Sequence, residues 1–199
     1  MSTKEQLDTI LEKWDLLKHP FYQAWSAGTL PVEALKVYAR EYGQFIRLLP
    51  KGWETLRDGE TAEEEREHAE MWQDFSAALG APVDVTPVHE ARQLADTARE
   101  LFSRPASTLG AMYAFEAQQP ATAKSKLNGL KTHYTLPSEV EPYFKVHSAN
   151  WHESQKLLRQ INALPAGEQA QAVEACDRMA RALWEALTGI HDVACLQQN

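Results

Sequence analysis

The stretch LGAMYAFEAQQPATAKSKLNGL, residues 109–130, repeats apolar residues at the spacing of an α-helix and places a glutamate among them. At about 100° per residue, one face of this helix carries the following side chains: Leu109, Met112, Tyr113, Glu116, Ala123 and Leu127. A glutamate is almost never fully buried without a partner, because its charge must then leave water. The pattern therefore predicts a helix on which Glu116 either pairs with a lysine or arginine or binds a metal ion.

The rest of the chain has the same helical period, and no segment shows the alternation typical of a β-strand. Ser2 and Glu5 form a capping-box pattern before the first helix, which we expect to run to about Lys18. Further helices are expected over 31–46 with a continuation to about 57, 63–79, 88–102, 106–128, 139–162 and 167–190. The sequence thus predicts an all-α fold, a bundle of about seven helices in a single domain spanning residues 1–199.

Composition excludes several classes of partner. The formal net charge of −8 argues against nucleic acid and against an anionic membrane surface. No apolar run approaches the ~20 residues that a membrane-spanning helix needs, and the first residues lack the apolar core of a signal peptide. The two cysteines, Cys176 and Cys195, give no disulfide framework. We therefore expect a cytoplasmic protein.

The charged segment EEEREHAEMW, residues 63–72, begins a helix whose apolar face includes a histidine. Recurring spacings of four, three and four residues connect His68, Trp72, Phe75 and Leu79. Glu64 lies four residues before His68 and Glu65 three, so either glutamate can share its face. The histidine is interpreted either as a hydrogen-bonded core residue or as half of a Glu/His metal-binding pair.

A second histidine lies on an apolar face in EPYFKVHSANWHESQKLL, residues 141–158. The face carries Val140, Phe144, His147, Trp151, Leu158 and Ile161. His152 points about 140° away from His147 in a regular helix, and a π-bulge would bring it round. Helical bundles assemble carboxylate metal sites from residues on several helices. This chain offers a Glu/His pair, a buried glutamate and a buried histidine from three expected helices. This ligand set favours iron, with manganese or zinc as alternatives.

Several stretches together resemble a known group of helical proteins: HPFYQAWSAGTL (19–30), LKVYAREYGQFI (35–46), HAEMWQDFSAALG (68–80), YAFEAQQPATAKSKLNGLKTHY (113–134), YFKVH (143–147) and MARALWEALTG (179–189). They resemble the haem-oxygenase-like superfamily that includes TenA, PqqC, UndA and the CADD-like proteins, and the CADD-like branch in particular. The resemblance covers nearly the whole chain, and the segment from Glu116 through Pro120 to Lys126 is its most specific part.

The resemblance implies a non-haem iron oxidase or oxygenase that acts on a small molecule with O2, as a homodimer. It implies metal ligands at His68, Glu116 and His147. Members of the branch carry an upstream carboxylate where this chain has Thr61, so a glutamate nearer the histidine must substitute. UndA-like members use a Glu-x-x-His pair, which favours Glu65 over Glu64.

The last metal-binding motif departs from the pattern of the branch. Trp151 and Ser154 occupy positions at which diiron members carry ligands. One strong metal site and a weak or vacant second one are therefore expected, unless His152 moves inward through a helical irregularity or Glu153 helps. A metal-free enzyme or small-molecule binding protein, similar to PqqC or TenA, and an interaction protein remain alternatives.

The CADD-like resemblance also implies formation of para-aminobenzoate, in which a tyrosine of the protein is consumed and a lysine supplies the amino group. The matching residues are Tyr22 and Lys126, with Tyr38 and Tyr143 also expected to line the cavity. Lys126 lies ten residues after Glu116, which corresponds to about 15 Å along one continuous helix. A lysine turned inward there would be partly desolvated, which lowers its pKa and makes the neutral amine available.

Overall fold

The computed structural model describes residues 1–83 and 87–196, and every regular element among them is helical. The elements are α1 (Thr3–Lys13), η1 (Leu16–Lys18, a 3₁₀-helix), α2 (Pro20–Ser26), α3 (Val32–Ile46), α4 (Leu49–Thr55), α5 (Gly59–Ala78), α6 (His89–Leu101), α7 (Pro105–Glu116), α8 (Gln119–His133), η2 (Ser138–Val140, a 3₁₀-helix), α9 (Pro142–His147), α10 (His152–Ala163) and α11 (Ala166–Leu196). The expected all-α class is confirmed. None of the described helices is long and apolar enough to cross a bilayer.

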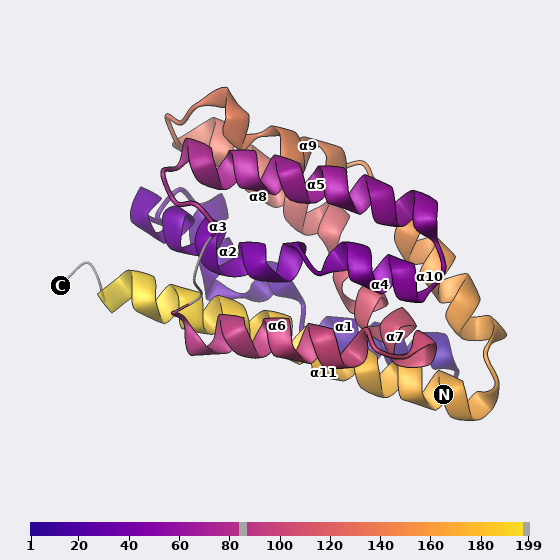
Figure 1. Cartoon of the computed structure of the whole chain (residues 1–199). Coiled ribbons are helices and arrows are strands. Elements are labelled where there is room, and N and C mark those ends of the chain that lie inside the picture. The colour runs from indigo at the N-terminus through magenta and orange to yellow at the C-terminus, as the bar shows by residue number, and fades with distance from the viewer. Residues whose placement is uncertain (84–86, 197–199) are drawn as a thin grey trace.

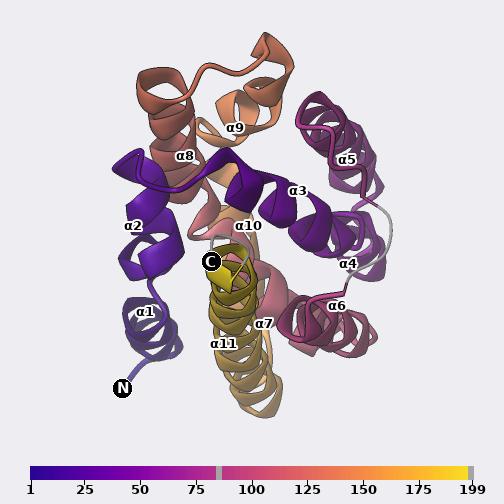
Figure 2. The same cartoon turned by 90° about the vertical axis from the view of Figure 1, so that its left-hand side faces the viewer.

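The longest helix, α11, organises one side of the bundle. It packs against α1, α3, α6 and α7 (Figure 1). Gly110 of α7 faces the carbonyl oxygen of Ala172 in α11, and a Cβ atom at Gly110 would lie only 1.8 Å from that oxygen. The glycine therefore allows the backbones of α7 and α11 to approach closely. Helices α5, α8 and α9 lie on the side of the bundle away from α11 (Figure 2).

Two of the expected long helices are interrupted. The helix expected over 106–128 is divided into α7, which ends at Glu116, and α8, which begins at Gln119. Pro120 explains the break, because its ring lacks an N–H and would collide with the carbonyl of Glu116 four residues earlier. The helix expected over 139–162 is divided into η2, α9 and α10, with a non-helical segment between His147 and His152.

The first expected helix also differs from the structure. The capping box of Ser2 and Glu5 is confirmed, but α1 ends at Lys13 and a 3₁₀-helix follows. Pro20 begins another helix, α2, as the residue that best tolerates the first helical position. The Nδ1 atom of His19 caps this helix by accepting a hydrogen bond from the backbone N–H of Phe21, at 3.0 Å. The break at His19-Pro20 therefore starts an extra helix that the sequence did not predict.

An aromatic core fills the space between α2, α3, α5 and α9. Its largest fully buried side chains include Trp25, Tyr38, Tyr42, Trp72 and Tyr143. The ring centroids of Trp72 lie 5.4 Å from Tyr38 and 4.8 Å from Tyr143, in edge-to-face contacts. Such aromatic pairs stabilise beyond the area they bury, by ~1 kcal/mol each. Cys176 is buried and free of any disulfide, and the side chain of Cys195 lies outside the described part.

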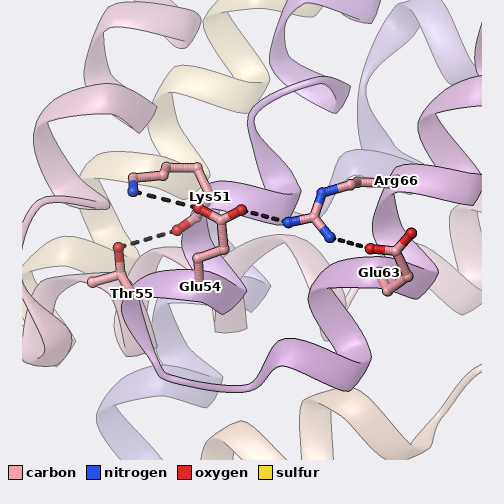
Figure 3. A network of polar contacts seen from close by, with 5 residues as sticks. All are labelled: Lys51, Glu54, Thr55, Glu63 and Arg66. Atoms are coloured by element: carbon pink, nitrogen blue, oxygen red, sulfur yellow. Dashed lines mark hydrogen bonds and ion pairs between the residues drawn. The ribbon is translucent and has the colours of Figure 1, made fainter.

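A polar network on the surface joins α4 to the beginning of α5 (Figure 3). Arg66 of α5 donates to Glu54 of α4 at 2.5 Å and also to Glu63 in its own helix. Lys51 reaches the second oxygen of Glu54 at 3.4 Å. These side chains are solvent-exposed, so each pair contributes little to stability. Glu63 of α5 therefore points toward solvent, and the opposite face of that helix is turned toward the interior.

Candidate metal centre and the neighbouring lysine–tyrosine cluster

Helix α5 turns one glutamate and one histidine inward. Glu65 and His68 are buried together with Trp72, whereas Glu63 and Glu64 are exposed. The Nδ1 atom of His68 lies 2.9 Å from the Oε1 atom of Glu65. Burial by itself lowers the pKa of His68, but the hydrogen bond and charge of Glu65 raise it above its ordinary value overall. The structure thus selects Glu65, not Glu64, as the glutamate beside His68.

His147, the last residue of α9, faces this pair. Its ring centroid lies 4.4 Å from that of His68. Its Nδ1 atom donates to the backbone carbonyl of Tyr143 at 2.7 Å, and its buried Nε2 atom has no hydrogen-bond partner. Burial, aided by the neighbouring His68, lowers the pKa of His147 to about 3, so the ring is neutral at pH 7. A neutral imidazole with one nitrogen fixed by a carbonyl and a free lone pair on the other is how proteins present a metal ligand.

Two further carboxylates complete the cluster. Glu116 ends α7 and Glu153 lies in the first turn of α10, and both are buried. Burial and the proximity of Glu153 and Glu65 raise the pKa of Glu116 well above its ordinary value. No lysine or arginine forms an ion pair with Glu116 or Glu153 within the described ranges. The cation that would relieve their repulsion is therefore not supplied by a basic side chain.

The donor atoms of these residues fit a metal ion. Ligand atoms of Glu65, His68 and His147 lie within 4.8 Å of one another, as do those of Glu65, Glu116 and Glu153. Four members of the cluster have a buried oxygen or nitrogen without a hydrogen-bond partner: Glu65, Glu116, His147 and Glu153. Such unpartnered atoms are costly in a folded protein unless a ligand uses them. The two triads share Glu65. The first adds two histidines to it, whereas the second contains only carboxylates.

Glu153 takes its place because the chain is not helical between α9 and α10. In a continuous helix Trp151 would follow His147 on the buried face, but Trp151 is 52% exposed. Helix α10 instead buries Glu153, Leu157 and Ile161, each four residues after the last. The four-residue spacing of these residues is present in the sequence. It is missed when one continuous helix is assumed from His147 onward. His152 is exposed and does not enter the buried cluster.

Thr61 remains at the position of the missing upstream carboxylate, where it contacts α10. Lys156 of α10 donates to Thr61 at 3.3 Å and also forms an ion pair with Asp58, the N-cap of α5. These contacts hold α10 against the beginning of α5. One turn further along α5 is Glu65, and one turn back along α10 is Glu153, which explains why the two carboxylates meet.

A second polar cluster surrounds Lys126. Its Nζ atom lies 3.3 Å from the hydroxyl oxygen of Tyr22 and 3.1 Å from that of Tyr38, and the two hydroxyl oxygens are 3.0 Å apart. The same nitrogen lies 4.8 Å from the ring centroid of Tyr22 and 5.2 Å from that of Phe144. All of these side chains are buried. Burial lowers the pKa of Lys126 to about 7.

Tyr143 contacts the candidate metal cluster. Its ring lies 4.1 Å from that of His147, and its hydroxyl accepts a hydrogen bond from Gln119 at 2.9 Å. Trp72 touches both Tyr143 and Tyr38 and thereby connects the two clusters. The structure thus brings Tyr22, Tyr38 and Lys126 together and places Tyr143 beside the histidines. Because α7 and α8 are separate helices, the distance expected along a continuous helix does not apply.

Comparison with known proteins agrees with this architecture. Residues 52–185 match the model of a family described as iron-containing redox enzymes. A 4-aminobenzoate synthase of Nitrosomonas europaea is 31% identical over 230 residues, covering 96% of this chain and 92% of the relative. A protein of Shewanella denitrificans with a haem-oxygenase-like fold matches with a TM-score of 0.83 at 14% identity, covering 100% of this chain and 96% of that one. A CADD-like protein of Nostoc punctiforme matches with a TM-score of 0.70 at 18% identity, covering 99% and 96%. The fold is therefore haem-oxygenase-like, as the sequence predicted.

Proposed function

The chain belongs to the family of iron-containing redox enzymes, and we propose that it uses iron and O2 to form an aromatic amine such as 4-aminobenzoate. The observation that carries the proposal is the position of Lys126, whose amine lies within hydrogen-bonding distance of two buried tyrosine hydroxyls. The relative from Nitrosomonas europaea, described as a 4-aminobenzoate synthase, supports the same reading.

The residues proposed to hold iron are the five that converge in the core. His147 through Nε2, together with His68 and Glu65, would form the tighter, nitrogen-containing site. Glu116 and Glu153, with Glu65 shared, would form a weaker site of carboxylates alone. When bound, iron supplies redox chemistry with O2 as the oxidant. Zinc lacks redox chemistry and would not serve this reaction, whereas manganese remains a chemically suitable alternative.

Lys126 is proposed to supply the amino nitrogen of the product. With its pKa lowered to about 7, a large fraction of the molecules carry the neutral amine at neutral pH. The neutral amine has a free lone pair, and its N–H groups donate to the hydroxyl of Tyr38 at 3.1 Å. An exposed lysine would be almost entirely protonated under the same conditions and would not be a nucleophile.

Tyr22 is proposed to supply the ring. The amine of Lys126 would form a C–N bond to the ring carbon that carries the hydroxyl, which leaves as water, and the Cε–Nζ bond of the lysine would then break. The Cα–Cβ bond of Tyr22 would be cleaved and its Cβ oxidised to the carboxylate, with O2 as the oxidant and an external electron donor as the reductant.

The burial of Tyr22 raises the pKa of the phenol above its ordinary value, so the hydroxyl stays protonated until it is oxidised. Tyr38 holds both reacting groups through its own hydroxyl. The aromatic side chains around them exclude water, which protects a reactive ring from side reactions.

The metal-free alternative is less well supported by the geometry. The donor atoms of each buried triad lie within 4.8 Å of one another, a spacing that suits a single ion held by all three, and four of the five residues have unpartnered buried atoms. Bound iron would use those atoms. Metal content of freshly purified protein tests this point directly, because a metal-free enzyme of the same fold would contain no stoichiometric iron.

The experiment that tests the reaction is complementation of a bacterium unable to make 4-aminobenzoate. Wild type should restore growth, whereas Tyr22→Phe and Lys126→Ala should not. Lys124→Ala is the matched control, since Lys124 is exposed on the same helix two residues earlier. Protein made with heavy-nitrogen lysine should yield labelled product in unlabelled medium. Growth supported equally by all variants, or an unlabelled product, would reject the proposal.

A further inference from the structure

Glu153 belongs to two groups of potential metal ligands, one buried and one open to solvent. Its carboxylate lies within 4.8 Å of ligand atoms of Glu65 and Glu116 in the core. On its other side, Glu64, His152 and Glu153 also offer ligand atoms within 4.8 Å of one another. We infer that Glu64, His152 and Glu153 form an outer binding site for a divalent cation, through which iron(II) reaches the buried cluster. The inference rests on the proposed function in one respect, that the buried cluster binds iron.

The register of α5 and α10 creates this outer site. Lys156 contacts Thr61 at the beginning of α5, and ligand atoms of Glu64 and Glu65, later in α5, lie close to those of Glu153, earlier in α10. One turn from that contact, Glu65 and Glu153 face the core, while their neighbours Glu64 and His152 face solvent. Adjacent residues on a helix differ by about 100°, so each helix presents one ligand inward and one outward at the same level.

The unpartnered carboxylate of Glu153 indicates that a ligand binds here. The residue is 1% exposed, and neither of its carboxylate oxygens has a hydrogen-bond partner. One carboxylate has two oxygens and about four lone-pair positions, so it can bind a cation from the outer side and then from the inner side. His152 and Glu64 are exposed and can meet a hydrated cation directly.

The charges favour transfer of a cation toward the core. Glu64, Glu65 and Glu153 all act on His68 electrostatically, so negative charge extends from the surface to the buried histidines. Lys156, the lysine or arginine of α10 nearest to Glu153 in the sequence, is paired with Asp58. An imidazole and two carboxylates suit iron(II), manganese(II), cobalt(II) and zinc(II), but two exposed ligands make such a site weak and exchangeable. Weak binding is what an entry site requires, because the cation must leave it again.

The first experiment measures the outer site by itself, with cobalt(II) as the probe under anaerobic conditions. In a His68→Ala/Glu116→Gln/His147→Ala variant the imidazoles of the buried cluster and one carboxylate of its carboxylate triad are gone, and we expect weak cobalt binding to the outer site to remain. Adding His152→Ala or Glu64→Gln should reduce that affinity roughly tenfold or more, the usual effect of removing a group that supports a metal site. Helical circular dichroism verifies that each variant is folded. Affinity that is unchanged by both additional substitutions would overturn the inference.

The second experiment measures how fast the apo-protein takes up iron(II) from solution without O2. Glu64→Gln and His152→Ala should load roughly tenfold more slowly than wild type and reach the same final iron content. The controls are Glu67→Gln, an exposed glutamate of the same helix, and His89→Ala, an exposed histidine at the start of α6; both should load like wild type. Loading of Glu64→Gln and His152→Ala at the wild-type rate would overturn the inference.

The two proposals fail in different ways. If iron binding is lost in His68→Ala while Glu64→Gln and His152→Ala affect neither rate nor affinity, the outer site is wrong and the buried iron site stands. If wild type binds a cation that is lost in His152→Ala but not in His68→Ala, the outer site stands and the proposed buried iron site is wrong.

Discussion

The Nζ atom of Lys126 lies 3.3 Å from the hydroxyl oxygen of Tyr22, although 104 residues separate the two in the chain. Helix α8 carries the lysine and α2 the tyrosine, and these two helices pack directly against each other. Gly129 of α8 permits that approach, because a Cβ atom there would lie 2.8 Å from the ring of Trp25. An amine and a phenol are thereby held together inside the core, and no carboxylate of the described residues forms an ion pair with the lysine.

The pKa of Lys126 has a consequence for stability that depends on pH. Between its folded pKa of about 7 and its ordinary value of 10.5, the unfolded chain holds a proton that the folded protein has released. Wild type should therefore gain stability as pH rises from 7 to 10.5. Relative to Lys126→Met, it should be less stable below pH 7 by about 3–5 kcal/mol, since one pKa unit corresponds to ~1.4 kcal/mol. Urea unfolding at several pH values measures the difference between wild type and Lys126→Met, and the corresponding difference for Lys124→Met should not change with pH.

Glu116→Gln should have opposite effects on the metal-free and the iron-loaded protein. Because the pKa of Glu116 is raised in the folded state, its carboxyl opposes folding increasingly as pH rises above the ordinary value. The amide should stabilise metal-free protein at pH 7 by about 1–3 kcal/mol, and this gain should disappear near pH 4. At iron concentrations that fill the weaker site, wild type should become the more stable protein, because the variant lacks one of that site's three carboxylates. Thermal unfolding with and without iron tests this, and a lower melting temperature of the metal-free variant would contradict it.

His147→Ala should reduce iron content to background, because the buried Nε2 atom of His147 has no hydrogen-bond partner and is a donor of the proposed tight site. His89→Ala should retain wild-type iron, because His89 is exposed and far from the cluster along the chain. Metal analysis after anaerobic loading and desalting provides the measurement. Equal iron in both variants would place the metal elsewhere in the protein.

Glu153→Gln should separate the two proposed iron positions. Anaerobic titration of wild type should show one tight equivalent, assigned to Glu65, His68 and His147, followed by a weaker one. The variant should keep the first and lose the second, because Glu153 belongs only to the carboxylate triad of the buried cluster. Glu168→Gln, an exposed glutamate of α11, should titrate like wild type. Two equally tight equivalents in wild type would contradict the assignment of one tight and one weak iron site.

The amino-acid sequence by itself determined the helical class and the inward faces of single helices. The apolar spacing around His68 follows from one helix alone, because residues three and four apart share a face whatever the helix packs against. For the same reason the sequence placed Glu116 and His147 among apolar side chains, and the structure buries both. The choice of Glu65 over Glu64 came from the resemblance to related proteins, since both spacings are compatible with one face.

Only the tertiary structure decided which residues complete the two clusters. Glu153 enters the core because the chain leaves the helix after His147 and resumes with a different phase, and a change of phase cannot be read from a repeat assumed to be continuous. Lys126 would be read from local sequence as an exposed helix lysine. It is buried because α2 and α3 bring Tyr22 and Tyr38 to it from nearly a hundred residues away. Periodicity fixes the direction of a side chain within its own helix, whereas the meeting of helices depends on breaks, glycines and packing between distant segments.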